Sequence, residues 1–433
     1  MKKEQKLAVF KKKFVWIFCM TLCLVFAGCK DGSDDQADPA KAEESSENQV
    51  AAEETTTGGI LTETETIDDV TLDGMSMDIL KGMSTEEKVG QMLFVGLDSI
   101  RTDGKTGTLT SLKKETEKSV TTLSPGGIIL YSKNMKTQEQ TKEMIGTLQE
   151  WSRIPLFIGS EEEGGKTSRI ASVKGMKIKA GPEAKELGEA GDSQKVQEEG
   201  SRIGAYMKDL GFNLNFAPVA DVAAEEEQKI LDGRSYGTDS KQVSGMVEET
   251  VKGIQSQKVS AVLKYFPGQG SLKEDTHKGS VDVAKTIKEL RETEFVPFQA
   301  GIEAGADFVM VGHASYSLVT GNQTPASLSS LILSEILRNE LRFQSVIITD
   351  SMNMKAITEV YSSSDAAVKA IEAGADMILC PDNGKEIYEG ILQAVKEGKI
   401  EEDRINESVL RILKVKIKRE IIPRDTDLIE QSK

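Results

Sequence analysis

The alternation of short apolar runs with longer amphipathic stretches restricts the fold of this chain more than any other feature. Eight runs of strand length begin at Met92, Gly126, Pro155, Asn213, Val259, Ala306, Ser345 and Asp376. Stretches with helical periodicity lie between them, at 137–151, 196–210, 286–304, 328–341 and 366–373. Repeated strand–helix units favour a parallel sheet. Eight of them predict an α/β fold, a (β/α)8 TIM-type barrel, with a doubly wound open sheet as the alternative.

The first 28 residues predict an export signal that is not part of the fold. Six lysines among the first thirteen residues precede an apolar run, 14–27, which is short for a membrane span and typical of a signal-peptide core. Small residues then precede Cys29, as in bacterial lipoprotein signals. We therefore expect a lipid on Cys29 and an extracytoplasmic protein anchored to the cell membrane. An ordinary cleaved signal followed by a chance cysteine is the alternative.

Residues 29–72 predict a disordered acidic tether, which leaves 73–433 as a single folded domain. The tether is rich in Glu, Asp, Ser, Thr and Ala, and such a composition buries too little apolar surface to offset its ordering entropy. The formal net charge of −16, the absence of a basic stripe and an aromatic content of 5% argue against a nucleic-acid partner. Two of the four cysteines would leave with the signal, so no disulfide framework is expected.

A possible proton-transfer pair lies in the stretch VLKYFPGQGSLKEDTHKG, residues 262–279. An apolar strand there breaks into a loop rich in proline and glycine, and the loop carries Asp275 and His277. His277 is one of only two histidines in the chain. A carboxylate at this spacing can fix the tautomer of an imidazole and raise its basicity. The alternative is an exposed loop with a solvated histidine.

Polar side chains also end several of the predicted strands, where a barrel would bring them to one mouth. They are Glu161 to Glu163, Asp221, Lys264 with Tyr265, His313 and Asp350. Asp350 ends the apolar run 346–349, so a buried strand would hold its carboxylate rigidly at the mouth. A fixed carboxylate there can attack an anomeric carbon and form a covalent glycosyl intermediate. The alternative role for Asp350 is the N-cap of a following helix.

Several motifs in chain order resemble those of one enzyme family. GGIILYSKN resembles the family pattern G-G-[VI]-I-L-F-x-x-N, EEEGGKTSRI resembles D-Q-E-G-G-R-V-x-R-F, and GRSYGTD resembles R-S-[FY]-G-x-D. GFNLNFAPVADV, KYFPGQGSLKEDTH, PASLS, VIITDSMNM and AAVKAIEAGADMILCP match further motifs. From about Met92 to Lys418 the chain therefore resembles glycoside hydrolase family 3. Within it, the resemblance is to the bacterial exo-acting β-N-acetylglucosaminidases (β-hexosaminidases) that act on peptidoglycan fragments.

This resemblance implies a function and the residues that perform it. It makes 73–433 a catalytic barrel that removes terminal non-reducing β-linked N-acetylglucosamine with retention of configuration, through a glycosyl-aspartate. Asp350 would be the nucleophile, His277 the general acid/base and Asp275 its orienting partner. The sugar-binding positions of the family fall on Glu161, Arg169, Arg234, Lys264 and Tyr265. The substrate would be a carbohydrate, and no cofactor or metal is implied.

The chain departs from the family pattern in the wall of the sugar pocket. Glu161 stands where the family has aspartate, Lys166 where it has arginine, and Tyr265 and Gln269 where it has histidines. These departures affect the prediction of the substrate more than the prediction of the reaction. Another β-glycosidase or a phosphorolytic specificity in the same family is one alternative, and a sugar-binding lipoprotein without turnover is another.

Overall fold

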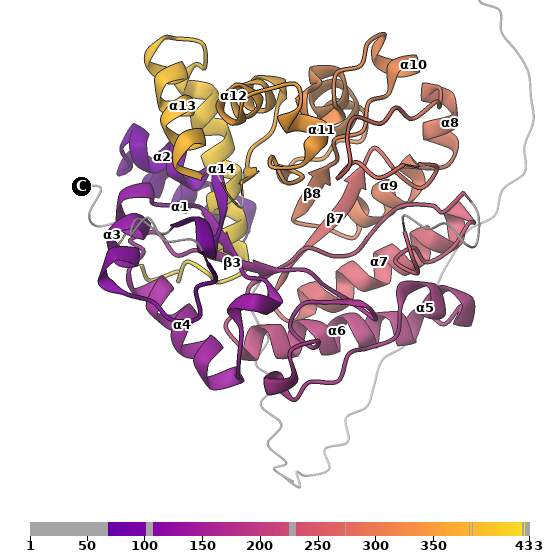
Figure 1. The fold of residues 1–433 in the computed structure, drawn as a ribbon, viewed down its shortest axis with the longest axis horizontal. Coiled ribbons are helices and arrows are strands. Elements are labelled where there is room, and N and C mark those ends of the chain that lie inside the picture. The colour runs from indigo at the N-terminus through magenta and orange to yellow at the C-terminus, as the bar shows by residue number, and fades with distance from the viewer. Residues whose placement is uncertain are drawn as a thin grey trace, which may run out of the picture. The chain divides into compact units, whose positions relative to one another are not determined.

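The eight predicted strands form one parallel sheet that closes on itself (Figure 1). The computed structural model describes residues 68–100, 107–224, 231–272, 274–380, 382, 384–426 and 428. The strands, in sheet order, are β10 (Ile378–Cys380), β1 (Leu93–Gly96), β2 (Gly127–Ile129), β3 (Phe157–Ser160), β6 (Leu214–Asn215), β7 (Ser260–Phe266), β8 (Phe308–Val311) and β9 (Val346–Thr349). A bridge between Ile348 and Met377 joins β9 to the start of β10. The predicted barrel is confirmed, and the open sheet is excluded.

Helices surround this sheet (Figure 1). They are α1 (Asp69–Lys81), α2 (Thr85–Gln91), α3 (Lys114–Leu123), α4 (Gln138–Glu150), α5 (Ala184–Ala190), α6 (Ser193–Asp209), α7 (Ser240–Ser256), α8 (Ile287–Glu292), α9 (Phe295–Glu303), α10 (Ser317–Thr320), α11 (Lys355–Thr358), α12 (Ser363–Ala373), α13 (Gly384–Lys396) and α14 (Glu402–Lys418). A π-helix, Leu331–Glu340, replaces the α-helix expected at 328–341. The helix expected at 286–304 is two helices, because the backbone leaves the helical region at Thr293, just before Pro297 enters the first turn of α9.

The predicted fourth strand is much shorter than its apolar run. The run from Asn213 to Val222 contributes only β6, with one further bridge from Val219 to Lys264. Pro218 interrupts the run, and proline has no N–H to donate to a neighbouring strand. The residues after β6 therefore form irregular backbone at the barrel mouth, and they include Asp221.

Aromatic rings fill the barrel where two strands carry glycine. The ring of Phe94 packs edge-to-face on Phe216, with 5.1 Å between centroids. A Cβ atom at Gly127 would lie 2.5 Å from the Phe94 ring, and one at Gly159 would lie 2.8 Å from Phe216. Only glycine leaves room for these rings at these two positions, so the glycines of β2 and β3 are requirements of core packing.

The folded part begins earlier than residue 73. Helix α1 starts at Asp69, because the side chain of Asp68 accepts a hydrogen bond from Thr71 N–H and caps the helix, and Leu72 is buried. The end of the predicted tether is thus helical. The predicted signal, Cys29 and the rest of the tether lie outside the described residues. No helix in the described ranges is long and apolar enough to cross a membrane.

Two buried carboxylates fasten the C-terminal helix to the amino ends of the strands. Asp307, just before β8, pairs with Lys418 at 3.0 Å and with Arg419. Asp376, just before β10, pairs with Arg338, Arg404 and Arg411. Both aspartates are fully buried. Helix α14 therefore stabilises the end of the barrel that lies away from the predicted active site.

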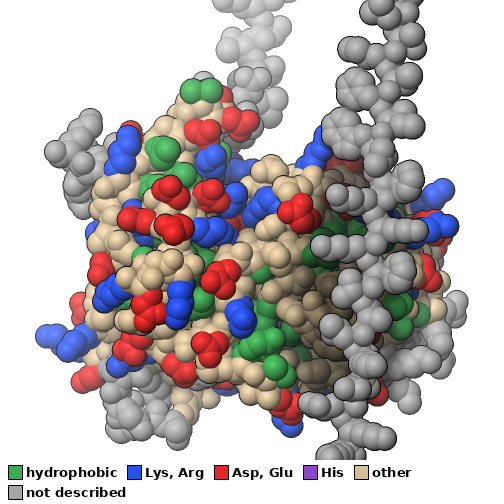
Figure 2. Space-filling view, turned by 90° about the horizontal axis from the view of Figure 1, so that it is seen from above, with side chains coloured by type: hydrophobic (Ala, Val, Ile, Leu, Met, Phe, Trp, Pro, Cys, Tyr) green, Lys and Arg blue, Asp and Glu red, His purple; other side chains and the backbone are tan. Residues whose placement is uncertain are grey.

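Charged side chains of both signs are mixed over the face seen in Figure 2. Lysine and arginine side chains lie beside aspartate and glutamate side chains on its described part, so this face carries no large patch of positive charge alone. This mixture accompanies the net charge of −16.

Candidate active site

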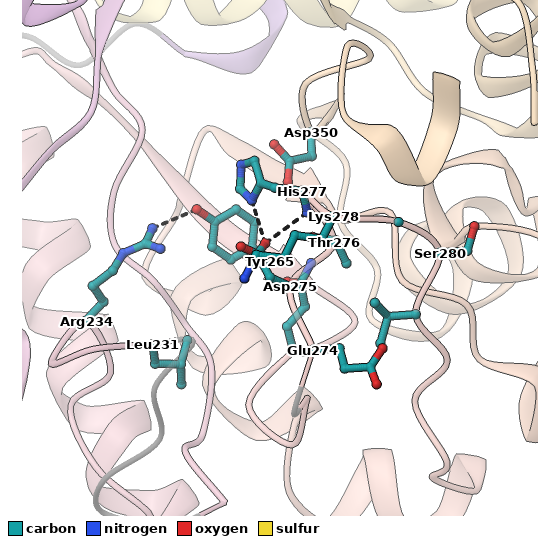
Figure 3. Close-up of a pocket in the computed structure, with 13 residues that line it drawn as sticks. Leu231, Arg234, Tyr265, Glu274, Asp275, Thr276, His277, Lys278, Ser280 and Asp350 are labelled. Carbon is teal, nitrogen blue, oxygen red and sulfur yellow. Dashed lines mark hydrogen bonds and ion pairs between the residues drawn. The ribbon is translucent and has the colours of Figure 1, made fainter. Parts of the chain in front are cut away.

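A pocket of about 780 Å³ lies at the carboxyl ends of β7 and β9 (Figure 3). Five of the predicted site residues line it: Arg234, Tyr265, Asp275, His277 and Asp350. The loop between β7 and Val281 supplies most of the remaining lining. The structure thus brings the three predicted catalytic residues to one pocket.

Asp275 and His277 form the predicted pair. His277 Nδ1 lies 2.8 Å from Asp275 Oδ1, and the same oxygen accepts a hydrogen bond of 2.9 Å from the His277 backbone N–H. Burial alone would raise the pKa of Asp275, but these two hydrogen bonds lower it. The His277 side chain is 74% exposed, which agrees with the exposed loop considered as the alternative. It also lines the pocket, and among the described residues the ring bonds only through Nδ1, which leaves Nε2 for proton exchange with a ligand.

Asp350 follows β9 and is nearly buried. Its backbone N–H donates to Val311 of β8 at 2.9 Å, and its Oδ1 accepts from the Ser351 N–H at 2.7 Å. The next helix, α11, begins only at Lys355 and has Met354 at its N-cap. The alternative role of Asp350 as a helix cap is therefore wrong.

His313 supports the turn that carries Asp350. Its Nε2 lies 3.0 Å from the Ser351 carbonyl oxygen, which can only accept, so Nε2 carries a proton. Its Nδ1 lies 2.7 Å from the Ser327 hydroxyl. Burial lowers the pKa of His313, against an opposing effect of Asp350. A neutral His313 with its proton on Nε2 satisfies both contacts, because its Nδ1 then accepts a hydrogen bond from the Ser327 hydroxyl.

The predicted sugar-binding residues join in one chain of ion pairs beside the pocket. Glu161 contacts Arg169 at 3.1 Å and Lys264 at 3.2 Å. Lys264 contacts Glu163 at 2.7 Å, and Glu163 accepts two hydrogen bonds from Arg234, at 2.7 and 2.8 Å. Burial would raise the pKa of Glu161, but Lys264 and Arg169 outweigh it and lower this pKa to about 2. Burial would also raise the pKa of Glu163, but Lys264 and Arg234 lower it, so both glutamates are ionised at neutral pH.

The sequence analysis placed Glu163 at the barrel mouth but gave it no role, although Glu163 lies at the centre of this chain of ion pairs. Glu163 lies in β4 (Glu162–Gly164), which pairs with β5 (Thr167–Ser168), and Glu161 immediately precedes β4. Side chains alternate along extended backbone, so these two face the cations. Glu162 faces away and accepts hydrogen bonds from Tyr206 and from backbone N–H groups. The alternation was the available signal, but no strand was predicted there.

The four departures from the family pattern have different surroundings. Glu161 and Tyr265 belong to the site itself. Gln269 lines the pocket but is largely buried. Lys166 lies on the surface in ion pairs with Glu183 and Asp232, at 3.3 and 3.2 Å, and does not line the pocket. Of the four departures, only Tyr265 and Gln269 line the pocket, and Glu161 lies beside it in ion pairs with Arg169 and Lys264.

The fold and this site agree with a sequence match over most of the chain. Residues 84–415 match the family described as Glycosyl hydrolase family 3 N terminal domain. The chain belongs to this family.

Individual relatives carry similar names. The chain is 25% identical over 367 residues to "Beta-hexosaminidase A" of Pseudoalteromonas piscicida, with 78% of this chain and 61% of the relative covered. It is 30% identical over 271 residues to "Beta-hexosaminidase LpqI" of Mycobacterium tuberculosis, with 61% and 68% covered. A family 3 β-N-acetylglucosaminidase structure from Paenibacillus sp. str. FPU-7 has a TM-score of 0.72 and 32% identity, over 78% of this chain and 63% of that one. This chain spans less than two thirds of the Pseudoalteromonas and Paenibacillus proteins.

Proposed function

We propose that the protein is a retaining, exo-acting glycosidase that removes terminal non-reducing β-linked N-acetylglucosamine from peptidoglycan-derived saccharides. The observation that carries the proposal is that Asp350 and the Asp275–His277 pair line one pocket. A fixed carboxylate and a separate proton donor are what a two-step displacement at an anomeric carbon requires. The names of the Mycobacterium and Paenibacillus relatives support the sugar class.

In the first step, the Asp350 carboxylate forms a bond to the anomeric carbon while the bond to the leaving oxygen breaks. His277 gives its Nε2 proton to that oxygen, since Nδ1 faces Asp275. In the second step, a water oxygen bonds to the anomeric carbon and releases Asp350, and His277 takes the proton of the water. Two inversions at one carbon retain the configuration.

The chain of ion pairs serves to bind the sugar. Charged groups make strong directional hydrogen bonds to hydroxyl and amide groups. Fixed cations and carboxylates that alternate along one wall offer both donors and acceptors to a polar ring. Arg234 and Tyr265 present this wall to the pocket.

Turnover of aryl β-N-acetylglucosaminides by Asp350→Ala and His277→Ala tests the assignment. Asp350→Ala should lose activity on every substrate. His277→Ala should lose most on a phenyl glycoside and least on a dinitrophenyl glycoside, whose departure needs little protonation. The matched control is Asp239→Asn at the N-cap of α7, where asparagine caps as well as aspartate. Equal losses by His277→Ala on both substrates would remove His277 from the acid step.

The same assay separates the alternatives. Release of free N-acetylglucosamine supports hydrolysis, and release of its 1-phosphate in phosphate buffer would indicate phosphorolysis. Faster turnover of an aryl glycoside of another sugar would mean that the protein removes that sugar rather than N-acetylglucosamine. Tight binding without turnover by the parent would indicate a sugar-binding protein and sink the proposal.

We also propose that a lipid on Cys29 anchors the protein to the outer face of the bacterial cell membrane. The proposal rests on the basic start of the chain, its short apolar run and the small residues before Cys29. An anchored barrel would act on saccharides near the cell surface.

A further inference from the structure

The loop that carries Asp275 and His277, residues 268–281, is fixed to the barrel at its root. The Tyr316 hydroxyl donates to the Gly268 carbonyl oxygen at 2.7 Å. The Gln269 backbone N–H donates to Asp221 Oδ1 at 2.7 Å. A Cβ atom at Gly270 would lie 1.7 Å from the Val222 carbonyl oxygen, so the two backbones meet closely. The root therefore rests on the segment after β6 and on the segment after β8.

Beyond the root, the two catalytic side chains of this loop bond to each other rather than to the barrel. Asp275 accepts both bonds from His277, and the His277 ring is mostly exposed. The far end of the loop is tied by backbone bonds between Val281 and Ser315 and between Ser315 and Val283. The position of His277 relative to Asp350 therefore depends on how firmly the two ends are held.

Asp221 is an unusual support for such a root. It is fully buried, and its Oδ2 has no hydrogen-bond partner among the described residues. The side-chain Nε2 of Gln269, 6% exposed as a residue, is also unpaired within that part of the chain. An unpaired buried polar atom carries its full desolvation cost. Because the Asp221 carboxylate is buried despite this cost, we look for a role of Asp221 other than packing.

The charges around Asp221 come from several elements. Burial raises the pKa of Asp221 to about 7, with Glu294 adding to the rise and Arg234 opposing it. The Tyr316 phenol also lies within electrostatic range, and Glu294 is itself paired with Lys285. Asp221 thus changes charge near neutral pH while its Oδ1 holds the loop root.

We propose that Asp221 is a positioning residue for the reaction: its carboxylate holds the root of the loop and so places His277 against the leaving oxygen. This inference rests on the proposed function. An ionised carboxylate is a stronger acceptor than a neutral acid for the Gln269 N–H. The loop root is therefore held more firmly when Asp221 is charged, and proton donation by His277 depends on that hold.

The kinetic test compares Asp221→Ala, which removes the acceptor, with Asp221→Asn, which keeps a carbonyl oxygen but cannot ionise. For Asp221→Ala, kcat/KM should fall about tenfold more on the phenyl than on the dinitrophenyl glycoside. This loss is smaller than the effect of removing the acid catalyst itself, because His277 is still present but less well placed. Asp221→Asn should restore most of this ratio. It should also remove the change of the ratio near pH 7 that the parent shows. Tyr316→Phe, which deletes one hydroxyl at the same root, should show a milder form of the Ala pattern.

Hydrogen exchange of the amides at 268–270 tests the hold on the root without any substrate. After correction for the intrinsic rate, Asp221→Ala should exchange faster there, and the parent should lose protection between pH 8 and pH 6 while Asp221→Asn does not. Asp307→Asn, at the opposite end of the barrel, should lower Tm without changing root exchange or the leaving-group ratio. Equal losses on both substrates with unchanged root exchange would overturn the proposal. If the parent turns over no glycoside, the proposed function fails and the exchange experiment still decides the role of Asp221. If Asp221→Ala does not fold, Asp221→Asn decides it by whether the pH dependence is lost in the same two measurements.

Discussion

Arg234 Nη2 donates a hydrogen bond of 2.7 Å to the phenol oxygen of Tyr265. Because that oxygen accepts from Arg234, the phenol proton points to another acceptor, and Tyr265 lines the pocket. The family has histidine at this position. Tyr265 therefore offers a ligand one hydrogen-bond donor whose direction is set by Arg234.

Tyr265→Phe should weaken the reaction by removing that donor. Losing one well-placed bond costs about 1–3 kcal/mol, or roughly 5- to 150-fold in kcat/KM at about 1.4 kcal/mol per tenfold. Steady-state kinetics on an aryl N-acetylglucosaminide measures the loss. Tyr236→Phe is the matched control, because its buried hydroxyl bonds Thr250 and it does not line this pocket. Unchanged kcat/KM in Tyr265→Phe would show that the phenol makes no bond in the transition state.

Glu163→Gln should destabilise the barrel mouth as well as reduce sugar binding. Its carboxylate is 6% exposed and balances Lys264, which is fully buried, and Arg234. Removing one partner of a buried ion pair costs about 3–5 kcal/mol. Urea unfolding measures this loss. Glu248→Gln, which breaks an exposed pair with Lys252, should cost at most about 1 kcal/mol. Similar losses in both variants would mean that water reaches Lys264.

Asp376 should make the free energy of unfolding depend on pH in the acid range. Burial would raise its pKa, but Arg338 and Arg411 lower it below the ordinary value of 3.8. A lowered carboxyl pKa contributes stability above the unfolded value, and this contribution is lost as the pH falls through the folded value. The unfolding free energy of the parent should therefore drop below about pH 4. Asp376→Asn should be less stable at pH 7 and show a smaller drop. Asp403→Asn, an exposed change on α14, should follow the parent curve, and an Asp376→Asn curve parallel to the parent would contradict the linkage.

Cys29→Ala should release the protein from membranes. The signal would still direct export, but no lipid could be attached to the first residue of the mature chain. Cell fractionation and metabolic labelling with a fatty acid measure the change. Cys380→Ala is the control, because this thiol is buried in β10. A Cys29→Ala protein that sediments with membranes as the parent does would refute the anchor.

The sequence predicted the barrel because each strand is a continuous apolar run, which is the pattern of strands buried on both faces. It predicted Asp275 and His277 together because they are two residues apart. Local patterns do not carry contacts between distant segments. The bond from Gln269 to Asp221 spans 48 residues, and the contact of Lys264 with Glu161 spans 103. Only the closed sheet brings those segments together.

The sequence patterns also did not predict the roles of residues that lie on irregular backbone or on very short strands. The run at 213–222 has the composition of a strand, but Pro218 interrupts its pairing, which resumes only as one bridge at Val219 and leaves Asp221 on a loop. Glu163 was placed at the mouth without a role, because a stretch of three glutamates and two glycines does not predict the short β4. Family resemblance supplied the predicted sugar-binding positions, and it did not supply Glu163, the carboxylate between Lys264 and Arg234.

The ion pairs of α14 have a consequence for the order in which the protein is made. Asp307 precedes its partners Lys418 and Arg419 by more than a hundred residues. Until the ribosome has released α14, this carboxylate lacks both of these cations. Closing the sheet before then would bury Asp307 without its ion-pair partners, which is costly. The barrel, and with it the pocket lined by Tyr265 and Asp350, should therefore become stable only once the last helix is available.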